Sequence, residues 1–329
     1  TKLIVNAAGI VMNTIPLIFN ERQINRTVLG GSERHSVQKL DAALVLLNSN
    51  CAQFRLPVLE NIAKCGFKEI VSIESNPDSY NLVEYSRRFP FIKFIVPHEK
   101  ASTGELINIG MSEVSSDFVL VIRDTLHTGI EFITPGIVER VKQQNLFCLT
   151  PRLKAGEMPS VPIVFSPAVE NSVFTIRSSS ILADGSPTLY PFDFIGFYNR
   201  KKFIQLGGFD YTITSEHWQN VDLGFRSWLW GEKINLSTVY SFDYVNSFPS
   251  EDLTYDLSYS RHYLKNLLPR FDEDHGVIPI SSFLVYLIRS GCGFIESLNQ
   301  FSDARLWVQK NRFRFKIDAK YLVENWGKI

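Results

Sequence analysis

The chain has 329 residues, 45% of them hydrophobic and 21% charged, so it can bury one large core or two of average size. Its 34 basic and 34 acidic side chains cancel, which excludes an overall electrostatic attraction to nucleic acid or to anionic lipid. The cysteines are scattered without CxxC pairs or metal-ligand spacing, which argues against zinc and predicts free thiols in a reducing, cytoplasmic compartment. They are Cys51, Cys65, Cys148 and Cys292.

The first residues are apolar but do not resemble a membrane span. Residues 3–19 are interrupted by Asn6, Asn13 and Pro16, fall short of the length that a span needs, and follow no charged region. We interpret them as a strand or packing arm within an N-terminal arm at 1–40. A trimmed targeting segment is the alternative.

Four short apolar runs, beginning roughly 25 residues apart, predict strands at 43–47, 70–73, 92–96 and 118–122. Apolar residues at helical spacing lie between them, after Pro57, across 80–89 and after Thr103, which we expect to cap the third helix. Strands that alternate with helices in this way predict an α/β fold with a mostly parallel sheet flanked by helices. Such sheets bind ligands at the carboxyl ends of their strands.

Polar residues follow three of the predicted strands, where a ligand is expected. They are Asn48 and Asn50 after the first strand, Glu74 after the second, and Arg123 and Asp124 after the fourth. Glu74 is placed to accept hydrogen bonds from a ribose or a base, and a solvated loop acid is the alternative. Neither a Gly-x-Gly-x-x-Gly fingerprint nor a P-loop occurs, which excludes the usual dinucleotide and P-loop proteins.

The pattern is irregular between 135 and 193, although 173–177 alternates like a strand. Asp193, near the end of this connection, can reach the predicted cleft. His217 is a further titratable side chain, and the sequence shows no partner for it.

Residues 194–231 form the most specific stretch of the chain. After a short strand, the pair Gly207–Gly208 permits positive φ angles and a close backbone approach to a ligand, with Asp210 directly behind. A helix follows in which Asp222 and Arg226 are spaced to pair. Its apolar face and its terminating glycine are Val221, Phe225, Trp228, Leu229 and Gly231.

The remainder, 251–329, is predicted to be a helical C-terminal extension. Its segment 305–320 holds six basic residues against the single acid Asp318, with aromatic residues between them. Such a segment can contact a membrane surface peripherally, and a solvated helix face is the alternative.

The order of these motifs resembles the GT-A fold glycosyltransferases, most closely family 2 and the polypeptide N-acetylgalactosaminyltransferases. The likeness covers about residues 43–240, and its most specific part is GGFD followed by W-E-D-V-D-L-x-x-R-x-W-x-x-G. This chain matches that pattern at Gly207, Gly208, Phe209, Asp210, Trp218, Val221, Asp222, Leu223, Arg226, Trp228 and Gly231.

The resemblance implies a Rossmann-like GT-A domain at 41–250 that transfers a sugar, with inversion, from a nucleotide-sugar donor to a glycan or lipid-linked acceptor. The donor-binding residues expected from it and from the strand ends are Asn48, Asn50, Glu74, Gly104, Asn108, Arg123 and Asp124. The expected acceptor-binding residues are Gly208, Trp218, Gln219 and Asn220.

Two departures from the family pattern affect its chemistry. Where Asp-x-Asp would bind Mn²⁺ or Mg²⁺ stands Arg123-Asp124-Thr125, so a metal site would need Asp124 together with His127. Where the catalytic Glu-Asp pair is expected stand Gln219 and Asn220, whose amides cannot accept a proton at neutral pH.

Three interpretations follow. In the first, the protein is an active transferase in which Arg123 supplies the positive charge of the metal, and Glu216, Asp210 or Asp222 is the base. In the second, it is an inactive pseudo-glycosyltransferase that binds nucleotides or glycans as a module or scaffold. The third, a sugar nucleotidyltransferase, would need a glycine-rich basic loop after the first strand, and none is there.

Overall fold

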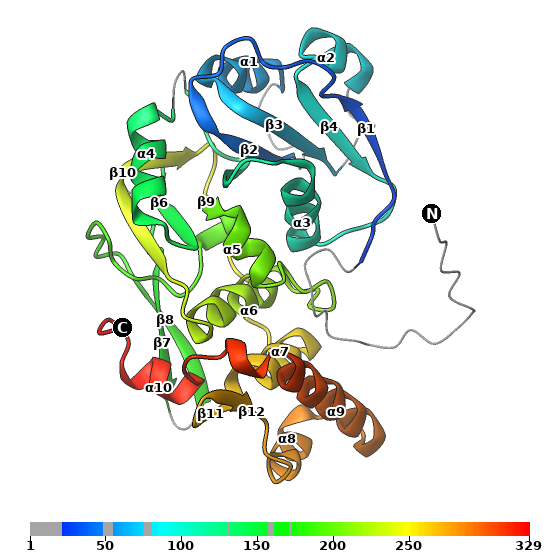
Figure 1. Cartoon of the computed structure of the whole chain (residues 1–329), viewed down its shortest axis with the longest axis vertical. Helices are drawn as coiled ribbons and strands as arrows, with labels where there is room; N and C mark the ends of the chain where they lie inside the picture. The colour runs from blue at the N-terminus through cyan, green and yellow to red at the C-terminus, as the bar shows by residue number, and fades with distance from the viewer. Residues whose placement is uncertain (1–21, 49–54, 76–80, 130–131, 157–160, 171–172) are drawn as a thin grey trace.

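Figure 1 shows the computed structural model, which describes residues 22–48, 55–75, 81–129, 132–156, 161–170 and 173–329. The predictions made for residues 3–19, for Asn50 and for Cys51 lie outside these ranges. The remaining cysteines, Cys65, Cys148 and Cys292, are free thiols.

An eight-stranded sheet crosses the molecule in the order β1-β4-β3-β2-β5-β9-β6-β10. The four predicted strands are its parallel neighbours β4, β3, β2 and β5, and β6 and β10 form a second parallel pair. The remaining pairings, β1 with β4 and β9 with β5 and β6, are antiparallel. The strands are β1 (Arg26–Gly30), β2 (Leu40–Asn48), β3 (Phe67–Glu74), β4 (Ile92–Pro97), β5 (Phe118–Arg123), β6 (Cys148–Ala155), β9 (Gly196–Asn199) and β10 (Ile234–Tyr244).

Helices cover both faces of the sheet, because alternate strand residues are apolar on both sides. Leu44 of β2 belongs to one core cluster with Leu59 of α1, whereas Val45 belongs to a second cluster with Ile107 of α3. The helices of these layers are α1 (Arg55–Cys65), α2 (Leu82–Arg88), α3 (Thr103–Glu113), α4 (Pro135–Gln144) and α5 (Arg200–Gln205). The predicted α/β architecture with a mostly parallel sheet is confirmed.

The predicted cap of α3 is wrong by one residue. Ser102, not Thr103, caps the helix, and its hydroxyl accepts from the Glu105 backbone while Glu105 reaches back to the Ser102 backbone. This reciprocal capping box satisfies two amides at the helix start and leaves the Thr103 hydroxyl free to turn elsewhere.

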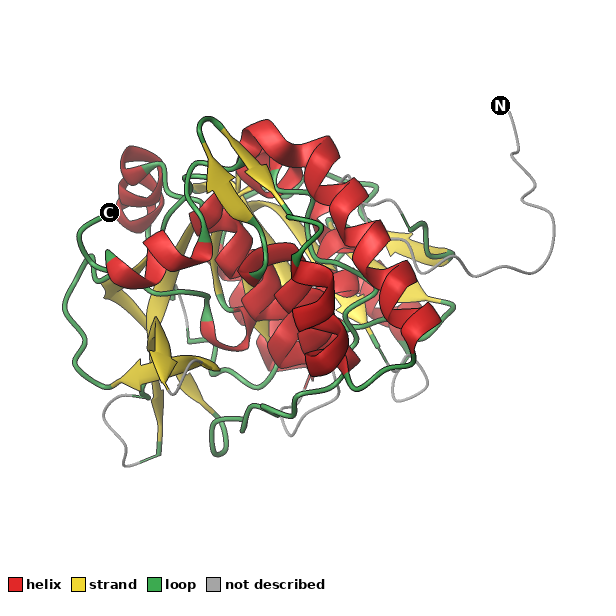
Figure 2. Cartoon of the chain, turned by 90° about the horizontal axis from the view of Figure 1, so that it is seen from below, coloured by secondary structure: helices red, strands yellow, loops and turns green. Residues whose placement is uncertain are grey.

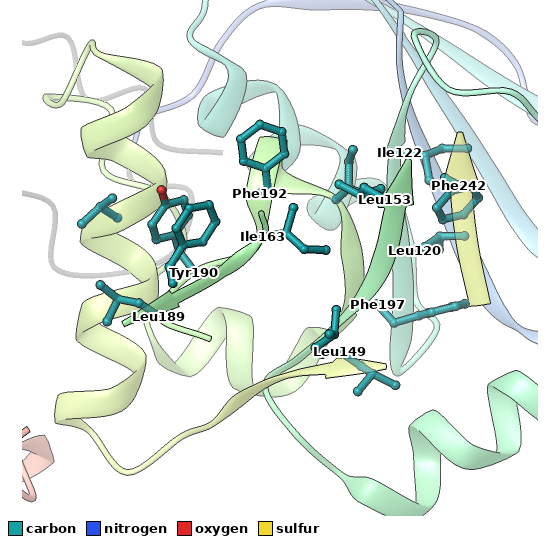
Figure 3. Packing of buried hydrophobic residues seen from close by; sticks show 14 of the residues in the cluster. Leu120, Ile122, Leu149, Leu153, Ile163, Leu189, Tyr190, Phe192, Phe197 and Phe242 are labelled. Atoms are coloured by element: carbon teal, nitrogen blue, oxygen red, sulfur yellow. The ribbon is translucent and has the colours of Figure 1, made fainter. Parts of the chain in front are cut away.

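The irregular connection carries the antiparallel hairpin β7 (Val164–Glu170) and β8 (Val173–Ser179), followed by a short 3₁₀ turn, η2 (Phe192–Phe194). Figure 3 shows aromatic side chains of this connection packed beside the sheet residues of the same core. Tyr190 stacks on Phe165 with ring centroids 4.3 Å apart, which anchors the segment that leads to η2.

Helix α6 (Glu216–Leu229) is the predicted amphipathic helix, and the C-terminal region packs against it. Trp228 contacts Trp326, and Trp230, just after the helix, stacks on Trp307. Gly231 follows with a φ of +86°, as its predicted terminating role requires.

The C-terminal region is seen at the lower end of Figure 1 and as a group of helices in Figure 2. It also contains a short β-hairpin, so it is not entirely helical. Its elements are α7 (Leu257–His262), the π-helical turn η3 (Tyr263–Leu267), β11 (Arg270–Asp272), β12 (His275–Val277), α8 (Ser282–Ser290), α9 (Phe294–Asn311), η4 (Arg312–Arg314) and α10 (Ala319–Glu324).

The boundaries at 40 and 250 remain predictions, although β1 shows that part of the 1–40 segment belongs to the sheet. In segment 305–320, Trp307 and Phe315 are buried and Phe313 is 59% exposed, and the peripheral membrane contact also remains a prediction. Among the described residues, no helix combines the length and the apolar character needed to cross a bilayer.

Candidate functional site

The site lies where the order of the parallel strands reverses. β2 pairs with β3 on one side and with β5 on the other, so the chain leaves the carboxyl ends of β2 and β5 in opposite directions. Open α/β sheets bind ligands at this point. Beside it is a cleft of about 480 Å³. Its walls come from η2, from the start of α6 and from 249–256, and they include Asp193, Glu216, His217, Asn220 and Glu251.

Arg123, the last residue of β5, is held between two carboxylates. Its Nε lies 2.7 Å from Oδ1 of Asp193, and one terminal nitrogen lies 3.0 Å from Oε2 of Glu216. The guanidinium also stacks over the Phe194 ring at 5.6 Å. We call Arg123, Asp193 and Glu216 the cleft cluster. Because the Glu216 side chain is 57% exposed, this side of Arg123 faces solvent.

Glu216 begins α6 and is also bound from α3. Its Oε1 accepts a 2.6 Å hydrogen bond from the Thr103 hydroxyl, the group left free by the Ser102 cap. Two helices and the end of β5 therefore meet at this carboxylate.

Asp193 is held in an unusual backbone conformation, with a φ of 52°. Its side chain is 8% exposed and accepts a 3.1 Å hydrogen bond from the Tyr244 hydroxyl. Burial raises the pKa of Asp193 to about 6, although Arg123 and Tyr244 act to lower it. A carboxyl group with a raised pKa therefore adjoins the cleft.

The residues after β5 do not fit a divalent cation. Asp124 is 4% exposed, whereas His127 is exposed, and the guanidinium of Arg123 directly precedes them. Across the described ranges, no three His, Cys, Asp or Glu side chains gather as a metal site. Only two candidate ligands beside a fixed positive charge make a poor site for Mg²⁺ or Mn²⁺. The described residues therefore give no support to the predicted Asp124–His127 site, which remains a prediction.

Two of the three predicted bases are not in the cleft wall but in a buried cluster of charges. Lys265 of η3 lies 2.8 Å from Oδ2 of Asp210 and 3.0 Å from Oδ2 of Asp222, and Arg226 lies 2.5 Å from the same Asp222 oxygen. We call these four residues the buried cluster. Arg226 and Asp222 are therefore not a surface pair, since their side chains are 3% and 0% exposed.

This burial argues against Asp210 and Asp222 as bases, and their assignment remains a prediction. Desolvation would raise the pKa of Asp222, but Lys265 and Arg226 outweigh it and lower the pKa to about 2. Asp222 is therefore a weak base that a ligand in the cleft does not reach, and Asp210 shares its burial. Of the predicted bases, Glu216 alone lines the cleft.

The predicted donor-binding residues Asn48 and Glu74 bind each other. Asn48 Nδ2 donates to Glu74 at 2.5 Å, Arg55 donates to the other Glu74 oxygen at 2.5 Å, and the Ser72 hydroxyl donates to that same oxygen at 2.6 Å. Glu74 is completely buried, so it is not a solvated loop acid. Its predicted contact with a nucleotide remains a prediction, and the structure adds Arg55 as a partner that the sequence did not suggest.

Hydrogen bonds link α3 to α6 and to the loop before it, through Gly104, Asn108 and Gln219. Asn108 exchanges two hydrogen bonds with the Phe209 backbone, at 2.9 and 3.0 Å. Gln219 accepts from the Gly104 amide at 2.9 Å and is completely buried. A side chain at Gly104 would meet Gln219 and Phe209 at 2.6 Å. These contacts position the glycine turn, and direct donor or acceptor contacts of these residues remain predictions.

The glycine turn itself has the predicted geometry. Gly207 and Gly208 have φ angles of 87° and 66°, which glycine adopts without strain. The Gly208 carbonyl accepts from Arg226 at 2.5 Å, so the turn is tied to the buried cluster.

Trp218 and Asn220 line hollows at the start of α6. Trp218 is 3% exposed, and its indole donates to the Thr254 carbonyl at 2.7 Å, while the ring borders a second pocket of about 280 Å³. Asn220 lines the cleft. Both keep their predicted acceptor-side roles as predictions.

His217 has a partner that the sequence does not indicate. Its Nδ1 lies 3.0 Å from Oε1 of Glu251, and Glu251 also accepts from the Tyr190 hydroxyl at 2.7 Å. Glu251 is 34 residues away in sequence, and no local spacing reveals the pair.

Comparisons with known proteins bear on the fold. The structure of GalNAc-T7 with UDP, GalNAc and Mn²⁺ matches this chain with a TM-score of 0.61 at 13% identity. The match covers 88% of this chain and 57% of that one, so the chain spans little more than half of GalNAc-T7. The chain has a GT-A fold. The predicted fold family is confirmed.

Two structures of residues 1–349 of S. aureus TarS, one in complex with UDP-GlcNAc, match with TM-scores of 0.43 and 0.44. Both are 12% identical to this chain and cover 82% of it, and the matches cover 71% and 72% of those chains. No protein-family model matches the chain, and no curated protein matches its sequence.

Proposed function

We propose that the protein transfers a sugar from a nucleotide-sugar donor to a hydroxyl acceptor, with inversion at the sugar carbon and without a bound metal. The acceptor is a glycan or a lipid-linked acceptor. The GT-A fold supports a nucleotide-sugar site at the ends of β2 and β5, and the cleft beside it supplies room for the reacting groups.

The observation that carries the proposal is the position of Arg123. A fixed guanidinium at the end of β5 can neutralise the negative charge that develops on a departing diphosphate, and its planar donors suit phosphate oxygens. Asp193 and Phe194 hold it from one side. On the other side the exposed Glu216 is the group that a phosphate would displace.

Binding without turnover is the second candidate. It is favoured by Gln219 and Asn220, which stand where the resemblance places catalytic carboxylates, and by the complete burial of Gln219. Hydrolysis of the donor separates the two candidates, because a binding module holds a nucleotide sugar without releasing the nucleotide.

The first test is the affinity for nucleotide sugars. UDP-, GDP- and dTDP-sugars are titrated into the wild type and into Arg123→Met by calorimetry, in the presence of EDTA. We expect one class to bind the wild type and the variant to bind it about 10 to 100 times more weakly, as when a charge-assisted hydrogen bond is lost. The matched control is Arg88→Met, which removes an exposed arginine of α2 that is paired with Glu60 of α1.

Failure of every nucleotide sugar to bind would contradict the proposal as a whole. Binding that appears only when Mn²⁺ replaces EDTA would contradict the role of Arg123 while leaving the nucleotide site in place. Tight binding without any nucleotide release would favour the binding module.

A further inference from the structure

A histidine in the wall of the cleft is positioned by a carboxylate from a distant part of the chain. His217 Nδ1 lies 3.0 Å from Oε1 of Glu251, and the second oxygen of Glu251 accepts a 2.7 Å hydrogen bond from the Tyr190 hydroxyl. The His217 residue is 5% exposed, yet it lines both the cleft and the neighbouring pocket. It stands where the two hollows meet.

The partners of His217 determine which ring nitrogen can accept a proton. A carboxylate accepts hydrogen bonds, so in the neutral imidazole Nδ1 carries the hydrogen and Nε2 keeps its lone pair. Burial and the adjacent Glu251 raise the pKa of Tyr190 well above its ordinary value, so its hydroxyl stays protonated and continues to donate. Among the described residues, no hydrogen bond engages Nε2. A carboxylate that orients an imidazole in this way is a known device for general-base catalysis.

Asn220, one turn further along α6, lines the same cleft and has an unused acceptor. Its Nδ2 donates to the Pro191 carbonyl at 2.6 Å, and because that carbonyl only accepts, the contact fixes the orientation of the amide. Asn220 is 2% exposed, and its Oδ1 has no partner in the part of the chain that the structure describes. A buried acceptor without a donor is destabilising, and a ligand hydroxyl would satisfy it.

The neighbouring pocket of about 280 Å³ offers the opposite chemistry. Aromatic rings form much of its wall, from Phe165, Phe174, Tyr190, Trp218 and Tyr255. Rings of this kind pack against the apolar face of a sugar, while the polar groups at the cleft face its hydroxyls. The two hollows together therefore suit a polyhydroxylated ring.

We propose that His217 is the general base of the transfer reaction, that Glu251 is its positioning residue, and that the acceptor is a sugar hydroxyl bound between His217 and Asn220. The inference rests on the proposed function and names its acceptor class. His217 Nε2 takes the proton from the acceptor O–H as that oxygen bonds to the anomeric carbon of the donor sugar. The bond from this carbon to the diphosphate breaks, and its electron pair leaves with the nucleoside diphosphate. Glu216 then serves as the counter-ion of Arg123 and not as the base.

The test uses hydrolysis of the donor by the full chain, in which water takes the place of the acceptor, and measures released nucleoside diphosphate from pH 5 to 9. Donor affinity is measured in parallel by calorimetry. We expect His217→Gln to lower the rate about 100-fold or more while the donor Kd changes by less than about twofold. Glu251→Gln should lower the rate about tenfold and move the acidic limb of the profile to lower pH, because the imidazolium loses its carboxylate. A merely structural role would not move that limb.

His275→Gln is the matched control, since His275 Nδ1 also lies 3.0 Å from a carboxylate, that of Asp274, but on β12 outside the cleft. We expect N-acetylglucosamine or glucose to accelerate nucleotide release by the wild type and ethanol at the same concentration to have no effect. Sugars without effect would overturn the acceptor assignment.

Three results would overturn the base assignment in distinguishable ways. Retention of hydrolysis within about threefold in His217→Gln, with loss in Glu216→Gln, would assign the base to Glu216. Wild-type protein that binds the donor but releases no nucleotide would overturn it in favour of the binding module. Wild-type protein that binds no nucleotide sugar would remove the proposed function together with the inference.

Discussion

In both the buried cluster and the cleft cluster, one cation lies between two carboxylates, although in the buried cluster Arg226 adds a second cation at Asp222. The two clusters differ in exposure. In the buried cluster the side chains of Lys265, Asp210 and Asp222 are at most 1% exposed. In the cleft cluster Arg123 is 15% exposed and Glu216 is 57% exposed. The first arrangement has no room for a ligand, whereas in the second one carboxylate can give way to an anion.

This difference separates structural from functional charges better than residue type does. Removing one partner of a fully buried ion pair leaves an uncompensated charge, which is strongly destabilising. Removing a partner from a half-exposed pair lets water solvate the other, so stability changes little and ligand binding changes more. The same substitution in the two clusters is therefore expected to have opposite consequences.

Lys265→Met should give the largest effect. It leaves Asp210 and Asp222 without their shared cation, and we expect a loss of about 3–5 kcal/mol in the free energy of unfolding. Urea unfolding at neutral pH measures it. Arg123→Met is the matched comparison, with an expected loss below about 1.5 kcal/mol. Equal losses in the two variants would remove the distinction between the clusters.

Glu216→Gln should strengthen donor binding. The substitution removes the exposed counter-charge of Arg123, so a phosphate meets a guanidinium with one competitor fewer. We expect the affinity for the nucleotide sugar to rise by up to about tenfold, equivalent to about 1.4 kcal/mol. Calorimetry measures it, and Glu60→Gln, which removes the partner of Arg88 on α2, is the control. Weaker binding in Glu216→Gln would show that this carboxylate itself contacts the donor.

Much of the fold was predictable because its signals are local. Short apolar runs in the sequence predict the four parallel strands, and the apolar face of α6 follows from helical spacing within fourteen residues. The cap of α3 was misplaced by one residue because Ser102 and Thr103 are both good caps, and the reciprocal bond of Glu105 decides between them.

The site was less predictable because its partners are distant in sequence. Lys265 lies 55 residues from Asp210, and Glu251 lies 34 residues from His217. The motif that carries the resemblance drew attention to Asp210 and Asp222, but only the folded structure shows that they are buried. Local patterns specify elements, whereas accessibility and pairing arise from the packing of one element on another.

The smallest expected effect is on how stability depends on pH, which should change in opposite directions for a carboxylate of each cluster. The pKa of Asp222 is lowered to about 2, so its contribution to stability is present above the ordinary value of 3.8 and is lost as the pH falls toward 2. The pKa of Asp193 is raised to about 6, mainly by burial, so the native state binds more protons than the unfolded state between about 4 and 6. Its contribution is therefore present at low pH and is lost as the pH rises through 6.

Donor binding should follow the titration of Asp193. Below pH 6 this carboxyl becomes neutral, so Glu216 is the remaining counter-charge of Arg123 in the cleft cluster. The diphosphate of a nucleotide sugar stays ionised over this range. We expect affinity to increase severalfold from pH 7.5 to pH 5 in the wild type, and to be independent of pH over this range in Asp193→Asn. A dependence that survives in Asp193→Asn would place the titrating group elsewhere. A flat profile in the wild type would mean that Arg123 holds Asp193 ionised throughout, and that the two clusters differ in exposure but not in protonation.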